Sequence, residues 1–297
     1  MTETPIEQIE LLSVDLLDQH AALVKELKKL AKSLGLEFGW HYLLDLTWII
    51  SHLGQLEGKR IIDAGAGTGI IQWYLAQNGA EVISIDRNSR ELLPVRFRQQ
   101  FHAQGLRPSD LSTLLKVFQN DLNQKAPFRK KLSIFGHDLV DLTNLNRTQG
   151  KVLIYNQDLE KLLDIQSNSI DAIVAVSSLE HNTPDGLKNV VKELLRVLKP
   201  GSPLLATLTA APDRDTWHVP SSGWCFTDNS LRQFFNFGFE VPSNYPEYNK
   251  LFVKLRNCSE LRDNLADFYF MSDQNGMPWG TWDPQYIPVG VCKIKER

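Results

Sequence analysis

The chain has 297 residues, of which 42% are hydrophobic, and its formal net charge at pH 7 is −3. A chain of this kind can bury a large core, and its acidic balance makes nucleic acid an unexpected partner. Its three cysteines form no close pair, and no apolar run approaches the roughly 20 residues that span a bilayer. We therefore expect a reduced, cytoplasmic protein without a signal peptide, membrane anchor or structural zinc.

Residues 1–55 are expected to be helical and to precede the main sheet. Four leucines follow helical spacing, at Leu23, Leu27, Leu30 and Leu34. An aromatic run, Trp40, His41 and Tyr42, comes next. These three residues are candidates for an acceptor pocket, although packing of the helices onto the sheet is the more common reason for such residues.

Residues 61–70 read Ile-Ile-Asp-Ala-Gly-Ala-Gly-Thr-Gly-Ile, a pattern typical of a buried strand that ends on an acid and opens into a glycine turn. Glycines let the backbone turn sharply and approach a ligand, and the helix that follows presents free N–H groups. A dinucleotide site needs G-x-G-x-x-G, but its third glycine position is Ile70 here, and Gly69 comes one residue early. The spacing therefore indicates a nucleotide-type cofactor and disfavours NAD.

The run Asp63-x-Gly65-x-Gly67-x-Gly69 resembles motif I of class I S-adenosylmethionine (SAM)-dependent methyltransferases. The resemblance implies SAM as the cofactor and Asp63 as the group that binds its ammonium. Backbone N–H groups of the turn, which includes Ala66, would bind the carboxylate of SAM. The resemblance to this family also implies that the helices of residues 1–55 form a lid over the cofactor.

Two further strands are expected to end at cofactor residues. The apolar run 81–86 ends at Asp86, nineteen residues after Gly67, where nucleotide folds place a ribose carboxylate. The resemblance implies that Asp86 accepts hydrogen bonds from both ribose hydroxyls, with Arg87 beside it. A strand at 152–155 leads to Asp158 and Leu159, for which the resemblance implies contacts with the adenine amino group and ring. By itself, an aspartate after a strand is more typical of a loop or cap.

Residues 105–150 form an insertion longer than a strand-to-helix connection requires. Around it, residues 87–131 contain ten basic side chains and three acidic ones. A solvated surface would explain this excess. A phosphate, a carboxylate or an acidic carrier protein would also be favoured there.

A fourth strand is expected at 170–176, where the sequence is almost continuously apolar, as in a central parallel strand. It ends in Ser177-Ser178-Leu179-Glu180-His181-Asn182, which resembles the strand-four ending of small-molecule methyltransferases such as those of ubiquinone biosynthesis. Ser177 is therefore expected at the cofactor, with Glu180 and His181 at the mouth of the pocket. The Asp/Asn-Pro-Pro-Tyr sequence of methyltransferases that act on the amino groups of nucleic-acid bases is absent.

The remaining elements continue the alternation of strands and helices. They are a helix at 187–198, a strand at 203–209, a helix from Thr227 or Asp228 to Gly238, and a strand at 287–295. We expect a doubly wound, Rossmann-like α/β fold with a seven-stranded methyltransferase sheet and the ligand at the carboxyl ends of the strands. Residues 1–55 would form the lid and residues 56–297 the SAM-binding domain, with a second insertion at 242–286. The aromatic sequence 276–282 in that insertion would form either an apolar acceptor wall or an ordered loop.

The expected reaction is in-line transfer of a methyl group from SAM to a small molecule, with oxygen as the favoured acceptor atom and nitrogen or carbon still open. A hydroxyl acceptor needs a base or a metal. His181 is the candidate base, with Glu180 orienting it or binding substrate. His218 is the rival base, and Trp217 beside it is a further acceptor-binding candidate. We expect no metal, because the sequence has no evident cluster of carboxylates.

Three alternatives stay open at this stage. An RNA or protein methyltransferase could use the basic stretch to hold a polymer. A non-catalytic SAM-binding partner subunit would keep every cofactor residue, and an oxidoreductase is more remote. The acceptor molecule and the oligomeric state do not follow from the sequence.

Overall fold

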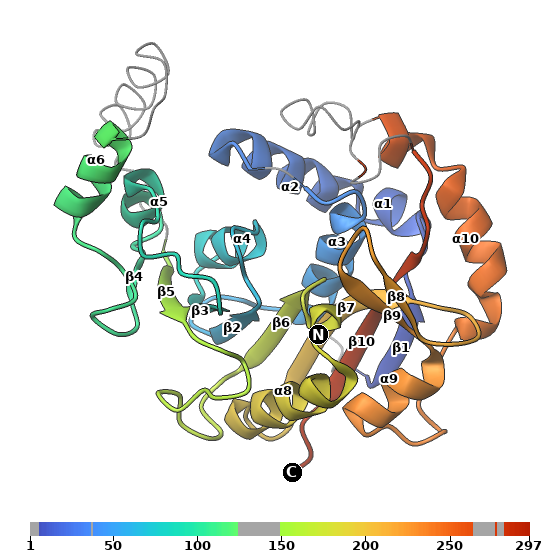
Figure 1. Cartoon of the computed structure of the whole chain (residues 1–297). Helices are drawn as coiled ribbons and strands as arrows, with labels where there is room; N and C mark the ends of the chain where they lie inside the picture. The colour runs from blue at the N-terminus through green and yellow to red at the C-terminus, as the bar shows by residue number, and fades with distance from the viewer. Residues whose placement is uncertain (1–5, 37, 124–148, 264–276, 278–281) are drawn as a thin grey trace.

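The computed structural model describes residues 6–36, 38–123, 149–263, 277 and 282–297 (Figure 1). In chain order the elements are β1 (Gln8–Leu11), α1 (Asp15–Gln19), α2 (Ala21–Leu34), α3 (Tyr42–Leu53), β2 (Arg60–Ala64), α4 (Ile71–Gln77), β3 (Glu81–Asp86), α5 (Val95–Gln100), β4 (Gln104–Gly105), α6 (Leu114–Asn123), β5 (Lys151–Asn156), β6 (Ala172–Val176), η1 (Leu179–His181), α8 (Pro184–Val197), β7 (Pro203–Ala210), β8 (Thr216–His218), β9 (Gly223–Phe226), α9 (Asp228–Phe235), η2 (Tyr245–Glu247), α10 (Tyr248–Arg256) and β10 (Ile287–Ile294).

One sheet organises the described residues. Its main path runs β1-β10-β7-β6-β2-β3-β5-β4, and β9 pairs with β7 and β8. The central strands β7, β6, β2, β3 and β5 are parallel, whereas β10 is antiparallel to β7. β2 and β6 are buried along nearly their whole length, as strands covered on both faces must be. The doubly wound α/β fold is confirmed.

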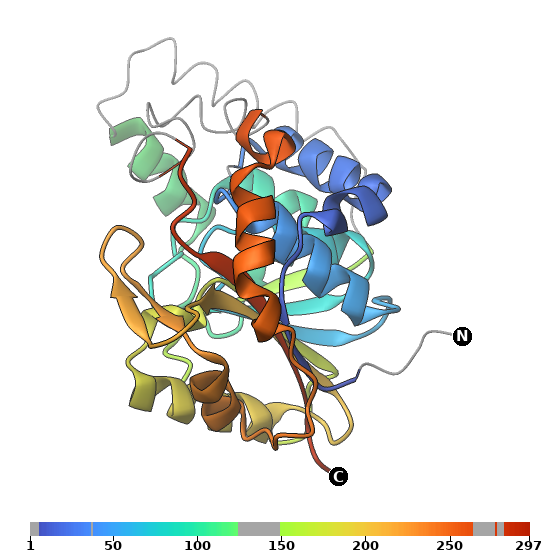
Figure 2. The same cartoon turned by 90° about the vertical axis from the view of Figure 1, so that its right-hand side faces the viewer.

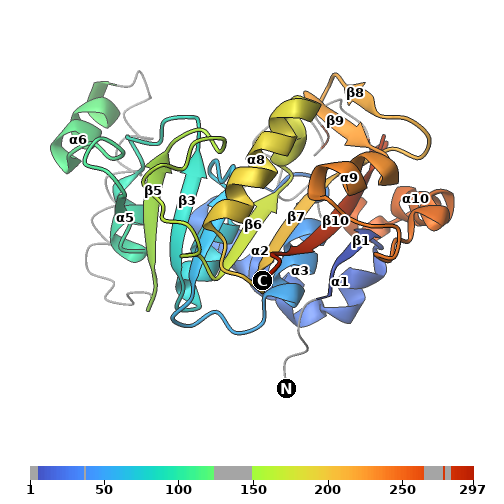
Figure 3. The ribbon, with the colours of Figure 1, turned by 90° about the horizontal axis from the view of Figure 1, so that it is seen from below.

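Helices cover both faces of the sheet. α8 and α9 lie on one face, and α2 and α3 lie on the other (Figure 3). α3 contacts β6, β7 and β10, and α4 contacts β3 and β5. α8 begins where the Thr183 side chain accepts a hydrogen bond from the Gly186 N–H, and its buried side chains recur at helical spacing.

The strand count differs from the expectation, because the sheet has ten strands within the described residues instead of seven. One extra strand is β1, in the segment for which only helices were expected. β1 pairs antiparallel with β10, and Ile9 and Leu11 face the core. The sequence Gln-Ile-Glu-Leu alternates polar and apolar residues, which is the pattern of a half-buried strand, but it is too short to stand out beside the leucine-rich helix.

The two insertions are described in part. β4 and α6 come from the first, and η2 and α10 come from the second, where α10 stands beside β10 (Figure 2). Residues 124–148 lie outside the described residues, as does most of the aromatic sequence 276–282, of which Met277 and Trp282 are described. No helix in the described ranges combines the length and the apolar character needed to cross a membrane.

Candidate active site

The glycine turn after β2 is fastened to β3. The N–H groups of Gly65 and Ala66 both donate to the Ile85 carbonyl, at 2.9 Å each. Gly65 has a φ of 73°, and a Cβ there would lie 2.5 Å from the Ser178 Cβ. Glycine is therefore required at this position both by the left-handed backbone and by the close approach of the next strand end.

Asp63, the penultimate residue of β2, is a buried carboxylate that lacks a complete set of partners. Its side chain is 1% exposed, and Oδ2 has no hydrogen-bond partner. Burial raises the pKa of Asp63 to about 7, the positive charge of Arg90 opposes this rise, and Asp86 adds to it. A carboxylate oxygen left free in this way fits a positively charged group that enters with a ligand.

Asp86 ends β3 and faces the turn. Its Oδ2 accepts a hydrogen bond from the Gly67 N–H at 2.8 Å, and its Oδ1 accepts one from the Asn88 N–H at 2.7 Å. These two bonds fix the orientation of the carboxylate. Each oxygen keeps a further lone pair that can accept a hydroxyl group.

A cavity of about 560 Å³ opens over these strand ends. All ten residues expected at the cofactor line it: Asp63, Gly65, Ala66, Gly67, Gly69, Asp86, Arg87, Asp158, Leu159 and Ser177. Gly35 and Leu36, which follow α2, and Tyr42 and Leu46 of α3 also line it.

The last residue of β6 and the two residues after it form another part of the cavity wall. Ser177 has a φ of 44°, which is uncommon outside glycine, and its Oγ donates to Glu180 Oε1 at 2.5 Å. Glu180 is 2% exposed, its Oε2 has no partner, and burial raises its pKa. Glu180 does not line the cavity. It therefore acts on the cavity through Ser177, and the expected direct contact with His181 is absent from the described hydrogen bonds.

His181 lines the cavity and has a defined tautomer. Its Nδ1 lies 2.8 Å from the Ser222 carbonyl oxygen. A carbonyl can only accept, so Nδ1 carries the proton of the neutral ring. Nε2 therefore keeps the lone pair that a base requires.

The rival residues lie elsewhere. His218 does not line the cavity, and its Nδ1 and Nε2 lie 2.7 Å from Ser221 Oγ and 2.8 Å from Gln285 Oε1. Trp217 is also outside the cavity and is 45% exposed.

The N-terminal aromatic run divides into one cavity residue and two packing residues. Tyr42 lines the cavity, and burial raises its pKa. Trp40 and His41 are buried outside the cavity wall, and His41 Nδ1 lies 2.6 Å from Asp45 Oδ2. Of the three, only Tyr42 therefore lies where it could contact a ligand in the cavity.

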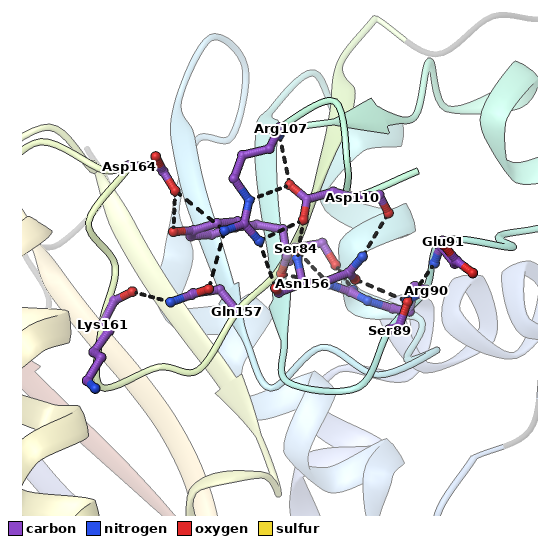
Figure 4. Close-up of polar contacts among 11 residues, drawn as sticks. Ser84, Ser89, Arg90, Glu91, Arg107, Asp110, Asn156, Gln157, Lys161 and Asp164 are labelled. Atoms are coloured by element: carbon purple, nitrogen blue, oxygen red, sulfur yellow. Dashed lines mark hydrogen bonds and ion pairs between the residues drawn. The ribbon is translucent and has the colours of Figure 1, made fainter. Parts of the chain in front are cut away.

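Two arginines that the sequence interpretation did not single out hold the cofactor loops in place (Figure 4). Arg90 is 8% exposed and lies beneath the glycine turn, where it donates to the Ser84 hydroxyl and the carbonyls of Ser84 and Tyr155. Arg107, in the first insertion, donates to the Asn156 carbonyl at 2.8 Å. The sequence shows both only as members of a basic stretch. Among the described side chains, no three His, Cys, Asp or Glu residues gather as a metal site would require.

The fold and the cavity define an α/β cofactor-binding enzyme whose buried strand-end acids fit a ligand with an ammonium and a ribose. Residues 41–243 match the family described as "Methyltransferase domain". The chain therefore belongs to this family and is a class I SAM-dependent methyltransferase that uses SAM as its cofactor.

The chain is also similar to curated proteins and to solved structures. Ubiquinone biosynthesis O-methyltransferases of Acinetobacter baylyi and Leptothrix cholodnii are 39% and 43% identical over 57 and 49 residues, which is 19% and 16% of this chain. The matched segments span 24% and 21% of those relatives' own lengths. Phosphoethanolamine N-methyltransferase 2 of Haemonchus contortus, solved with phosphomonomethylethanolamine and S-adenosylhomocysteine, is 15% identical with a TM-score of 0.50 and covers 95% of this chain and 60% of its own. This likeness concerns the fold.

Proposed function

We propose that the protein transfers the methyl group of SAM to a hydroxyl oxygen of a small molecule. The observation that carries this proposal is the position of His181, whose Nε2 lone pair is free at the wall of the cofactor cavity. The partial matches to ubiquinone O-methyltransferases support an oxygen acceptor.

The cofactor would lie along the strand ends. Asp63 Oδ2 would accept the ammonium of SAM, and Asp86 would accept the two ribose hydroxyls. Asp158 and Leu159 would hold the adenine. Because several N–H groups of the glycine turn already bond within the chain, the carboxylate of SAM would be bound by the amide of Thr68, which has no hydrogen bond among the described residues.

The reaction needs alignment and removal of one proton. Bound SAM supplies a methyl group on a positively charged sulfur, ready for in-line attack. As the O–CH3 bond forms and the S–CH3 bond breaks to leave S-adenosylhomocysteine, the acceptor proton would move to His181 Nε2, while Nδ1–H would remain bonded to the Ser222 carbonyl and stabilise the imidazolium. Tyr42 and Ser177 would line the acceptor side, and Glu180 would fix the Ser177 hydroxyl.

Three arginines of the basic stretch are engaged within the chain, which argues against their use in binding a polymer or an acidic carrier. Arg90, Arg98 and Arg107 all direct their guanidinium groups to backbone carbonyls within the chain. Such arginines have fewer donors left for phosphate.

The test supplies methyl-labelled SAM and the purified protein to a cell extract that is then separated into small-molecule, RNA and protein fractions. We expect label in the small-molecule fraction, and much less label with Asp86→Ala at limiting SAM. Label confined to RNA or protein would contradict the proposed substrate class. Binding of SAM without any transfer would indicate a non-catalytic subunit.

A further inference from the structure

The last residue of β5, Asn156, is held entirely by residues outside its own strand. Its N–H donates to Asp110 Oδ1 at 3.1 Å, and its Nδ2 donates to the Asp110 carbonyl at 2.7 Å. Its carbonyl accepts from Arg107 Nη2 at 2.8 Å, and its Oδ1 accepts from the Arg90 N–H at 3.0 Å. Both the backbone and the amide of Asn156 are therefore fixed from outside, chiefly by the first insertion (Figure 4).

Arg107 and Asp110 are themselves locked together. Arg107 Nη2 and Nε donate to the two carboxylate oxygens of Asp110 at 2.9 and 3.2 Å, a bidentate pairing that fixes geometry as well as charge. The guanidinium carbon lies 4.6 Å from the centre of the Tyr155 ring. Asp110 is 1% exposed, whereas the Arg107 side chain is 34% exposed, so the pair joins a buried carboxylate to a guanidinium at the surface.

The segment that Asn156 begins leads directly into the cofactor cavity. The Gln157 N–H donates to the Asp86 carbonyl at 2.9 Å, and the Gln157 side-chain oxygen accepts from Arg107 at 3.4 Å. Asp158 and Leu159 then line the cavity, while Arg107 does not. Arg107 can thus influence the cofactor only by positioning this segment.

We propose that Arg107 and Asp110 form a latch that positions Asp158 and Leu159 and thereby sets the selectivity of the enzyme for the adenine end of SAM. The proposal rests on the assignment of Asp158 and Leu159 to adenine in the proposed function. Arg107 is a positioning residue. Its place in the first insertion ties that insertion to cofactor recognition.

The test compares S-adenosylhomocysteine with S-inosylhomocysteine, in which a carbonyl replaces the adenine amino group and N1 carries a proton. Calorimetry on the full chain measures both affinities, and thermal unfolding is recorded alongside. In the unmodified protein, S-adenosylhomocysteine should bind at least about tenfold more tightly, the effect expected of one hydrogen bond to a charged group. Arg107→Ala should lower its affinity about tenfold and remove most of the preference.

Two further variants separate positioning from general stability. Arg107→Lys keeps the charge and the aliphatic stem, and should retain the fold but only part of the preference because it cannot pair in a bidentate manner. Arg256→Ala is the matched control, because Arg256 also stacks on a ring, Phe252, and pairs with a carboxylate, Asp283, away from the cavity. It should leave the preference unchanged.

Asp158→Ala distinguishes failure of the latch from failure of the adenine assignment. If Asp158→Ala removes the preference while Arg107→Ala and Arg107→Lys retain it in full, the latch is wrong and the assignment stands. If Asp158→Ala retains the preference, the assignment fails, and the latch proposal fails with it. Loss of the preference in both Asp158→Ala and the Arg107 variants supports the latch.

Discussion

Asp63 and Glu180 are two buried carboxyl groups, each with one oxygen that has no hydrogen-bond partner. Burial of such a group is unfavourable unless it is neutral or meets a partner. Asp63 lines the cavity and Glu180 does not, so only Asp63 can receive its partner from a ligand. This difference supports the proposed binding of the SAM ammonium by Asp63.

The affinity for S-adenosylhomocysteine should depend on pH through Asp63. Burial raises the Asp63 pKa to about 7, so the empty site is protonated below that pH. Because the ligand ammonium requires the carboxylate, affinity should fall about tenfold per pH unit below 7 and level off above it. Calorimetry between pH 5.5 and about 8 measures this, in the range set by the shifted group.

The same shift fixes the sign of the stability effect in the empty protein. The folded state holds the Asp63 proton up to about pH 7, whereas the ordinary pKa is 3.8, so this group's contribution to stability falls as pH rises between those values. The Asp63→Asn variant should bind S-adenosylhomocysteine weakly, and its affinity should no longer depend on pH in this range. A variant that retains the dependence would place the titrating group elsewhere.

Asp86→Ala should weaken binding of S-adenosylhomocysteine by roughly 1.5–3 kcal/mol, the scale of hydrogen bonds to a charged group. The physical reason is loss of the ribose hydroxyl acceptor together with the bond that the carboxylate receives from Gly67. Calorimetry at pH 8 isolates this change from the titration of Asp63. Unchanged affinity would remove the ribose assignment.

His181→Ala should reduce kcat at least about 100-fold with cofactor affinity preserved, because removal of a general base has that scale of effect. His218→Ala is the matched comparison, since both of its ring nitrogens already have partners outside the cavity. It should retain kcat within about tenfold, the spread expected when no proton transfer is lost. The reverse ranking of the two variants would move the base to His218.

At the scale of single elements, the glycine turn requires Gly65 for two reasons, its positive φ and the close approach of Ser178. Gly65→Ala should lower the free energy of unfolding by roughly 2–4 kcal/mol, because it adds strain at positive φ to a clash with Ser178. Urea denaturation measures the change. Gly58→Ala is the matched control, with a φ of 72° and no atom within 4 Å of the added Cβ. Equal losses in the two variants would show that the close approach of Ser178 is unimportant.

The elements that the sequence predicts well are those with local signals. β2, β3 and β6 are largely apolar runs with polar residues at or next to their ends, so their approximate limits and the cavity residues nearby follow from adjacent positions. β1 was missed because its partner β10 lies almost at the other end of the chain. Arg107 was missed for the same reason, since its bonds to Asn156 join positions 49 residues apart.

At the scale of the whole molecule, the sheet brings the ends of the chain together. β10 pairs with β7 and β1, and α3, whose Tyr42 and Leu46 line the cavity, contacts β6, β7 and β10. The N-terminal helices, the strands at the cavity and β10 thus share one core. We therefore expect the division into residues 1–55 and 56–297 to describe two roles within one cooperative unit.

The most direct test of the account is a crystal structure of the protein with S-adenosylhomocysteine. We expect the ligand amino group within hydrogen-bond distance of Asp63 Oδ2, the ribose hydroxyls at Asp86 and the adenine against Leu159. The homocysteine sulfur should then face the side of the cavity that contains Tyr42, Ser177 and His181. A ligand bound in the reverse direction, or outside this cavity, would contradict the assignment of the site.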